Sequence, residues 1–172
     1  MKRIHFLITP ILKNWSTTQN FTFAEQLHIG IRYFDLRVCR TTNESQAKQS
    51  PFTFTHGLLG GLVRDGLEEI NTFLSRYPQE VVLLDFNHFY DFNDQSNHEQ
   101  LIELIHEIFG RKICTSAENI VECTLNYLWN HQQQVILLYE QQRDRCSMYI
   151  DRIGHFFQVG CSREDIFKKN VI

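Results

Sequence analysis

The sequence predicts an α/β fold built from strand and helix units like those of a β/α barrel. Segments with apolar residues at helical spacing alternate along the chain with short apolar runs. The runs Val81 to Leu84 and Val135 to Leu138 are continuous, which is typical of parallel strands buried on both faces. About four units of this kind can be recognised, against the eight of a closed barrel. We therefore expect an incomplete, TIM-barrel-like fold of about four β/α units.

The first unit begins with a helix start signal. Thr22 to Glu25 fits a capping box, in which the hydroxyl and the carboxylate each bind a backbone N–H of the first turn. A short helix through Leu27 should follow and end at Gly30, because glycine readily takes up the left-handed conformation that ends helices. The first strand is predicted over 31–38.

The second strand is predicted over 52–56, where Phe52, Phe54 and His56 alternate with threonines and so share one face. Glycines follow it directly. Apolar residues at helical spacing then predict an amphipathic helix over 62–76, which ends before Pro78.

Later elements follow the same reasoning. The continuous run predicts a buried strand over 80–86, and a helix should follow from about residue 98 to Gly110. A further helix is expected over 117–131 and a third apolar strand over 134–139. Beyond Glu140 no strand and helix unit is evident, and we expect a helix and a basic tail there.

Composition narrows the class of protein. With 172 residues and 42% hydrophobic residues, the chain is long enough for one domain with a real core. A net charge of -3, with 17 Lys and Arg residues spread along the chain, gives no basic patch for nucleic acid. The apolar runs are far shorter than the roughly 20 residues that span a bilayer.

The cysteines and the amino terminus indicate a compartment. The five cysteines include no Cys-x-x-Cys pair and are an odd number, which favours free thiols in a reducing environment. Residues 1–10 are basic and then apolar, but they lack the sustained apolar core of a signal peptide. These features predict a cytoplasmic protein.

Polar residues gather at the predicted strand ends. Because residues two apart on a strand face the same way, Asp35 and Arg37 should project together. The other candidates are His56, Asp85, Asn87, His88 and Glu140. In β/α barrels the active site lies at the carboxyl ends of the strands. An acidic and a basic side chain at one strand end, with His56 at the next, predict a site for an anionic substrate there. The alternative for Asp35 and Arg37 is a structural ion pair.

The chain resembles the X-domain-containing proteins of the phosphatidylinositol-specific phospholipase C family, in particular the small ones that consist of the X domain alone. The resemblance rests on several short motifs that occur in the same order as in that family. The matching stretches are 14–20, 25–27, 30–38, 56–58, 65–67, 78–80 and 84–90, within about 13–140. The resemblance implies a single partial X domain over 1–172, with 141–172 as a divergent tail. It also implies a distorted TIM barrel that cleaves the phosphodiester of phosphoinositides with two histidines.

The resemblance assigns roles to the candidates. His56 is similar to the general acid, and Arg37 stands where metal-independent relatives place an arginine against the phosphate. Asp35 would orient Arg37 or the substrate hydroxyl, while Asp85, Asn87 and His88 would contact the substrate. Asn87 falls where calcium-dependent relatives carry a glutamate ligand. We therefore expect no metal and no cofactor, with calcium as the alternative.

The sequence departs from the family pattern at one point, and this leaves two functions open. The Gly-Ser/Thr-His-Asp segment that carries the first catalytic histidine is not found upstream of residue 14, and His5 has no motif around it. The chain is then either a hydrolase of phosphoinositides or a catalytically incomplete remnant that binds lipid or protein. The expected partners are a phosphoinositide membrane surface, contacted peripherally, and a second copy of the chain joined through exposed sheet edges.

Overall fold

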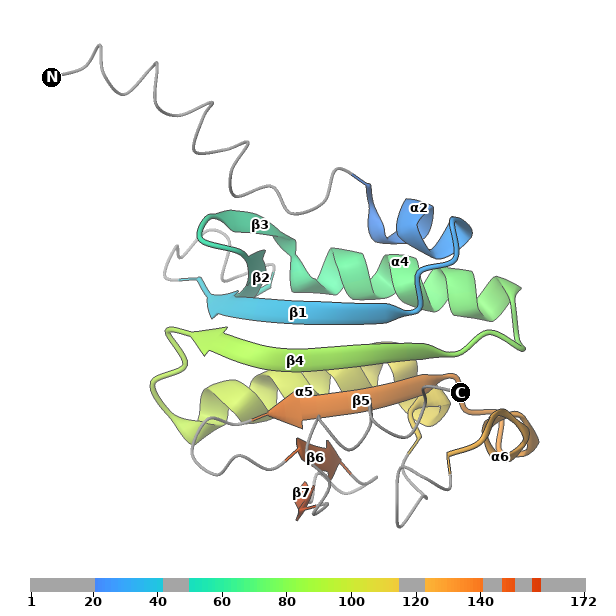
Figure 1. The fold of residues 1–172 in the computed structure, drawn as a ribbon. Coiled ribbons are helices and arrows are strands. Elements are labelled where there is room, and N and C mark those ends of the chain that lie inside the picture. The colour runs from blue at the N-terminus through green and yellow to red at the C-terminus, as the bar shows by residue number, and fades with distance from the viewer. Residues whose placement is uncertain (1–20, 42–49, 115–122, 141–146, 151–155, 159–172) are drawn as a thin grey trace, which may run out of the picture.

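A computed structural model describes residues 21–41, 50–114, 123–140, 147–150 and 156–158. These residues form one mixed sheet of seven strands in the order β3-β2-β1-β4-β5-β6-β7 (Figure 1). The strands are β1 (Tyr33–Arg40), β2 (Phe52–Thr55), β3 (Leu59–Leu62), β4 (Val82–Tyr90), β5 (Val135–Glu140), β6 (Ser147–Ile150) and β7 (Phe156–Gln158). The central strands β1, β4 and β5 are parallel, and the strands on both sides of them are antiparallel.

One face of this sheet is covered by the two longest helices, α4 (Val63–Arg76) and α5 (Gln95–Phe109), which lie behind β1, β4 and β5 in Figure 1. The shorter ones are α2 (Phe23–His28), the 3₁₀ turn η1 (Gly110–Lys112) and α6 (Leu125–Asn130). No helix within the described ranges is both long enough and apolar enough to cross a membrane.

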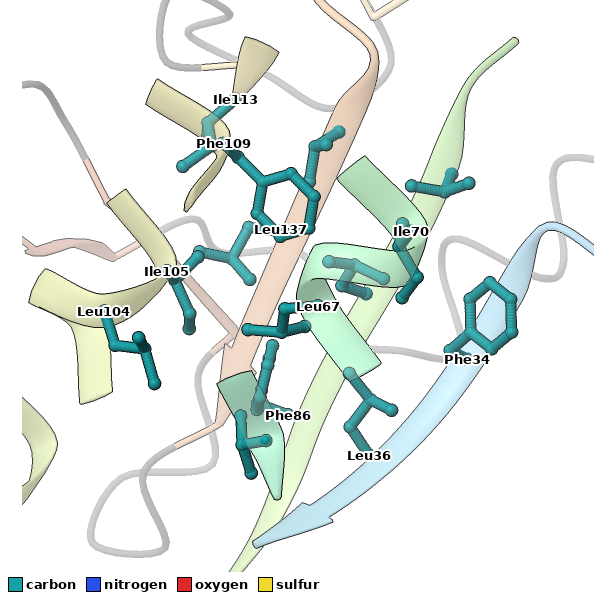
Figure 2. Packing of buried hydrophobic residues seen from close by; sticks show 14 of the residues in the cluster. Phe34, Leu36, Leu67, Ile70, Phe86, Leu104, Ile105, Phe109, Ile113 and Leu137 are labelled. Carbon is teal, nitrogen blue, oxygen red and sulfur yellow. The ribbon is translucent and has the colours of Figure 1, made fainter. Parts of the chain in front are cut away.

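The main core lies between the sheet and these two helices. Leu67 and Ile70 of α4 and Ile105 of α5 pack over Leu36 and Phe86 of the strands (Figure 2). The alternation on β1 is responsible, because it buries every second side chain on the helix side. The other face of β1 is left to polar residues.

The signals for helix ends that the sequence contains are confirmed at α2 and α5. Thr22 and Glu25 form the capping box at α2. Gly30, just past that helix, has φ 98°, and Gly110 at the end of α5 has φ 50°. Both values lie in the region that favours glycine.

Two predictions were wrong: the direction of the second strand, and the helix expected after Glu140. The strand at 52–55 runs antiparallel to β1, although strands alternating with helices suggested parallel units throughout. No helix joins the two strands within the described residues, and a parallel pair would need a long crossover, usually a helix. The helix expected in the tail is replaced by β6 and β7, which extend the sheet from β5.

The helix expected over 117–131 is described only in part. Its last part is α6, while residues 115–122 lie outside the described residues. Cys114 and Cys123, on either side of that gap, have their sulfurs 3.3 Å apart.

Gly66 allows α4 to approach its neighbours closely. A Cβ at this position would meet the ring of Phe23 at 2.6 Å and the ring of Phe54 at 2.7 Å. We expect Gly66→Ala to lower the free energy of unfolding by about 1–3 kcal/mol, since overpacking outweighs the gain in helix propensity. Urea unfolding measures the effect. Gly61→Ala is the control, because its Cβ would meet nothing within 4 Å; equal stabilities of the two variants would contradict the prediction.

The half-buried ring of His98 makes stability depend on pH. Its Nδ1 is hydrogen-bonded to the Tyr139 hydroxyl at 2.8 Å. Burial lowers the pKa of His98 below its ordinary 6.5, against a weaker opposing effect of the Asp94 carboxylate. The unfolded chain then binds more protons just below pH 6.5, so stability is full above that pH and falls as the pH drops through it.

Urea unfolding at a series of pH values tests this dependence. We expect the loss of stability between about pH 7 and 5 to be smaller in His98→Gln than in the wild type. His131→Gln, which makes the same change of side chain at an exposed helix end, is the control. An identical pH profile in His98→Gln and the wild type would refute the assignment to His98.

Candidate active site

The face of the sheet opposite α4 and α5 carries a polar cluster, made of Tyr33, Asp35, Arg37, Asp85, Asn87 and His88. On β1, Phe34 and Leu36 are buried in the core. Because successive side chains of a strand point to opposite faces, Tyr33, Asp35 and Arg37 face the other way. The prediction that Asp35 and Arg37 project together is confirmed by their 3.7 Å ion pair.

A β-bulge in β4 completes the cluster. Leu36 pairs with Phe86, but the next residue, Arg37, pairs with His88, so Asn87 is an extra residue. Phe86 and Phe89 both pack in the core although they are three residues apart, an odd spacing that a regular strand would place on opposite faces. The bulge therefore leaves Asn87 and His88 together on the polar face.

Hydrogen bonds connect these side chains across the two strands. The amide nitrogen of Asn87 donates to Asp35 Oδ1 at 2.7 Å. The Nδ1 atom of His88 lies 2.6 Å from Asn87 Oδ1. The second carboxylate oxygen of Asp35 faces the Arg37 guanidinium at 3.7 Å. A continuous chain of polar contacts thus runs from Arg37 to His88.

Asp85 is the most deeply buried member of the cluster, with 1% of its surface exposed. It is the neighbour of Asp35 in the parallel ladder, and its Oδ2 accepts a hydrogen bond from the Tyr33 hydroxyl. Tyr33 was not among the residues predicted from the sequence. Its position two residues before Asp35 on the same strand was the available signal.

The remaining candidates, His56 and Glu140, come from the ends of β2 and β5. His56 follows the last residue of β2 and is exposed; its backbone N–H donates to Leu58 O, and its ring makes no hydrogen bond or ion pair with the described residues. Glu140 ends β5, where its backbone pairs with Ser147 of β6.

Asp91, the residue directly after β4, lies against Cys39, whose thiol is 3.4 Å from the Asp91 carboxylate. Burial, together with this carboxylate, raises the pKa of Cys39 above its ordinary value. Across the described ranges, no group of three or more His, Cys, Asp or Glu side chains is arranged to hold a metal ion.

Arg37 differs from other arginines around the sheet. Arg32 binds Glu80 at 2.8 Å, Arg64 binds both carboxylate oxygens of Glu107, and Arg40 binds Asn97. Among the described residues, the Arg37 guanidinium makes only the 3.7 Å contact with Asp35, which is too long for a hydrogen bond. Its donors are free to bind an anion that approaches the polar face.

The solved structures identify the class of fold. The chain resembles a phosphatidylinositol-specific phospholipase C from Staphylococcus aureus that contains pentafluoro-Phe, with a TM-score of 0.54 and 15% sequence identity. The match covers 81% of this chain and 51% of that one. The chain is therefore an α/β protein with part of the TIM-barrel-like fold of these phospholipases.

Relatives among curated proteins are closer in sequence. The chain is 46% identical to mouse and 47% identical to human PI-PLC X domain-containing protein 2 over 133 residues, and 41% identical to human protein 3 over 129 residues. These matches cover 75–77% of the chain. The chain belongs to the PI-PLC X domain-containing proteins, and it spans 38–42% of the length of these relatives. No family model matches the chain.

Proposed function

We propose that the polar cluster is part of a phosphodiesterase site that cleaves the headgroup of phosphoinositides by general acid and base catalysis, without calcium. The observation that carries the proposal is the Arg37 guanidinium, which keeps its donors free beside an acid, an amide and an imidazole. A guanidinium binds phosphoryl oxygens in a bidentate way and stabilises the charge that develops on them.

The other side chains fit the remaining tasks. His56, exposed at the end of β2, would give a proton to the leaving oxygen. Asp35, Asp85 and Asn87 line the polar face and would accept or donate hydrogen bonds to sugar hydroxyls. Membrane contact is supported by Leu58 and Leu59, which directly follow the His56-Gly57 turn and are 47% and 61% exposed.

The residues present do not fit a calcium ion. Calcium needs six to eight oxygen ligands, and the carboxylate of Asp35 already faces a guanidinium and an amide N–H. The amide oxygen of Asn87 is turned toward His88. The positive charge of Arg37 would further repel a dication at this place.

Hydrolysis of phosphatidylinositol vesicles tests the proposal. We expect release of the water-soluble headgroup at the same rate with added calcium and with a calcium chelator. His56→Ala should lower kcat by about 10²-fold or more, the typical contribution of a general acid. His131→Ala is the matched control at an exposed position.

Two outcomes would overturn the proposal. Turnover that needs calcium would mean that a metal, rather than Arg37, neutralises the phosphate. Vesicle binding without any turnover would favour the alternative of a catalytically incomplete domain that only binds lipid.

A further inference from the structure

The hydrogen bonds of Asn87 fix which nitrogen of the His88 ring carries a proton. Asp35 Oδ1 lies 2.7 Å from Asn87 Nδ2, and since a carboxylate only accepts, the amide nitrogen must lie on that side. The amide oxygen then faces His88 Nδ1 at 2.6 Å and also only accepts, so Nδ1 must be the donor. The neutral ring of His88 therefore has its lone pair on Nε2.

We propose that Nε2 of His88 is the proton acceptor of this site, and that Asn87 and Asp35 are positioning residues that hold it in this tautomer. The proposal rests on the proposed phosphodiesterase function. An imidazole base oriented by a hydrogen-bonded amide or carboxylate is the arrangement that activates nucleophiles in many hydrolases. Here the β-bulge supplies it, because it turns Asn87 and His88 to one face.

The position of His88 suits this role. Its neighbour across the ladder is Arg37, whose donors are free for a phosphate. A phosphodiester held by that guanidinium would lie beside the imidazole. Charged residues near His88 in the sheet include Arg37 and Asp35 on β1, Asp85 on its own strand and, by backbone register, Glu140 at the end of β5.

The proton transfers balance in a single displacement at phosphorus. The nucleophilic hydroxyl gives its proton to His88 Nε2 as its oxygen forms the new P–O bond. The P–O bond to the leaving oxygen breaks, and that oxygen takes a proton from the imidazolium form of His56. The site ends with His88 protonated and His56 neutral, and exchange with water restores both.

Nuclear magnetic resonance of the ¹⁵N-labelled full chain reads the tautomer without any substrate. We expect neutral His88 to carry its proton on Nδ1 in the wild type. Asn87→Leu should lose this preference and return the ring to the Nε2–H tautomer that histidine favours in water. Asn87→Asp should keep Nδ1–H, since a carboxylate also accepts. His98, held by Tyr139, reports in each spectrum whether the sheet is intact.

Activity measurements then separate this inference from the proposed function. His88→Gln should lower kcat by about 10²-fold. A wild-type ring in the Nε2–H form overturns the inference, whether or not the chain is active. Full activity of His88→Gln also overturns it. A third outcome is that His88 carries its proton on Nδ1 but the chain shows no turnover. The hydrogen bonds from Asp35 through Asn87 to His88 would then be as described, but both the phosphodiesterase function and the role of His88 as a base would be refuted.

Discussion

Replacing Phe86 by alanine is expected to lower the free energy of unfolding by about 3–5 kcal/mol, the usual cost of deleting a fully buried aromatic ring. Phe86 has no exposed surface and lies in the centre of the parallel strands. Its ring stacks on that of Tyr139 with centroids 6.1 Å apart. The cavity would open beneath the bulge at Asn87, so the polar face should lose order as well.

Urea unfolding measures this loss, and Leu59→Ala is the control because its side chain is 61% exposed. We expect the control to stay within about 0.5 kcal/mol of the wild type, as is usual for surface changes. If Phe86→Ala cost no more than this control, the ring could not lie in the core as described.

The parallel centre of the fold could be predicted because its signal is local. A strand buried on both faces must be apolar at consecutive positions, and the runs in β4 and β5 have this pattern. The ends of α2 and α5 were equally readable, since Gly30 and Gly110 have the positive φ angles that follow helices.

The direction of β2 in the sheet was harder to predict from the sequence. Its alternating pattern is typical of an antiparallel strand with one solvated face, but the same pattern fits a parallel edge strand. The pairing of Val38 with Phe54 decides the direction, and pairing is a property of two strands rather than of one sequence stretch. The short strands β6 and β7 depend on the same kind of information, because each needs the edge of a neighbour.

Most residues of the candidate site could be predicted from the sequence, but the β-bulge that brings Asn87 and His88 to the same face was not predicted. The spacing of Asp35 and Arg37 placed both on one face, and the structure agrees. The bulge at Asn87 was missed, although the change of phase from Phe86 to Phe89 was a usable signal. Without the bulge, period two alone would have placed His88 on the helix side.

Replacing Arg37 by alanine is expected to lower kcat for phosphatidylinositol hydrolysis by about 10³-fold, as is typical when a guanidinium that stabilises phosphoryl charge is removed. Arg37→Lys should restore only part of this, because an ammonium keeps the charge but not the bidentate fork. Arg76→Ala, at the end of α4, removes the same group far from the cluster and is the matched control.

Stability measured on the same variants separates a phosphate-binding role from a structural ion pair. The contact between Arg37 and Asp35 spans 3.7 Å and is partly exposed to solvent, so its loss should cost less than about 1 kcal/mol. A functional guanidinium therefore predicts a large fall in kcat at nearly unchanged stability. If Arg37→Ala instead lost stability while the remaining folded protein kept its turnover, the ion pair would be structural and the phosphate would have to be bound elsewhere.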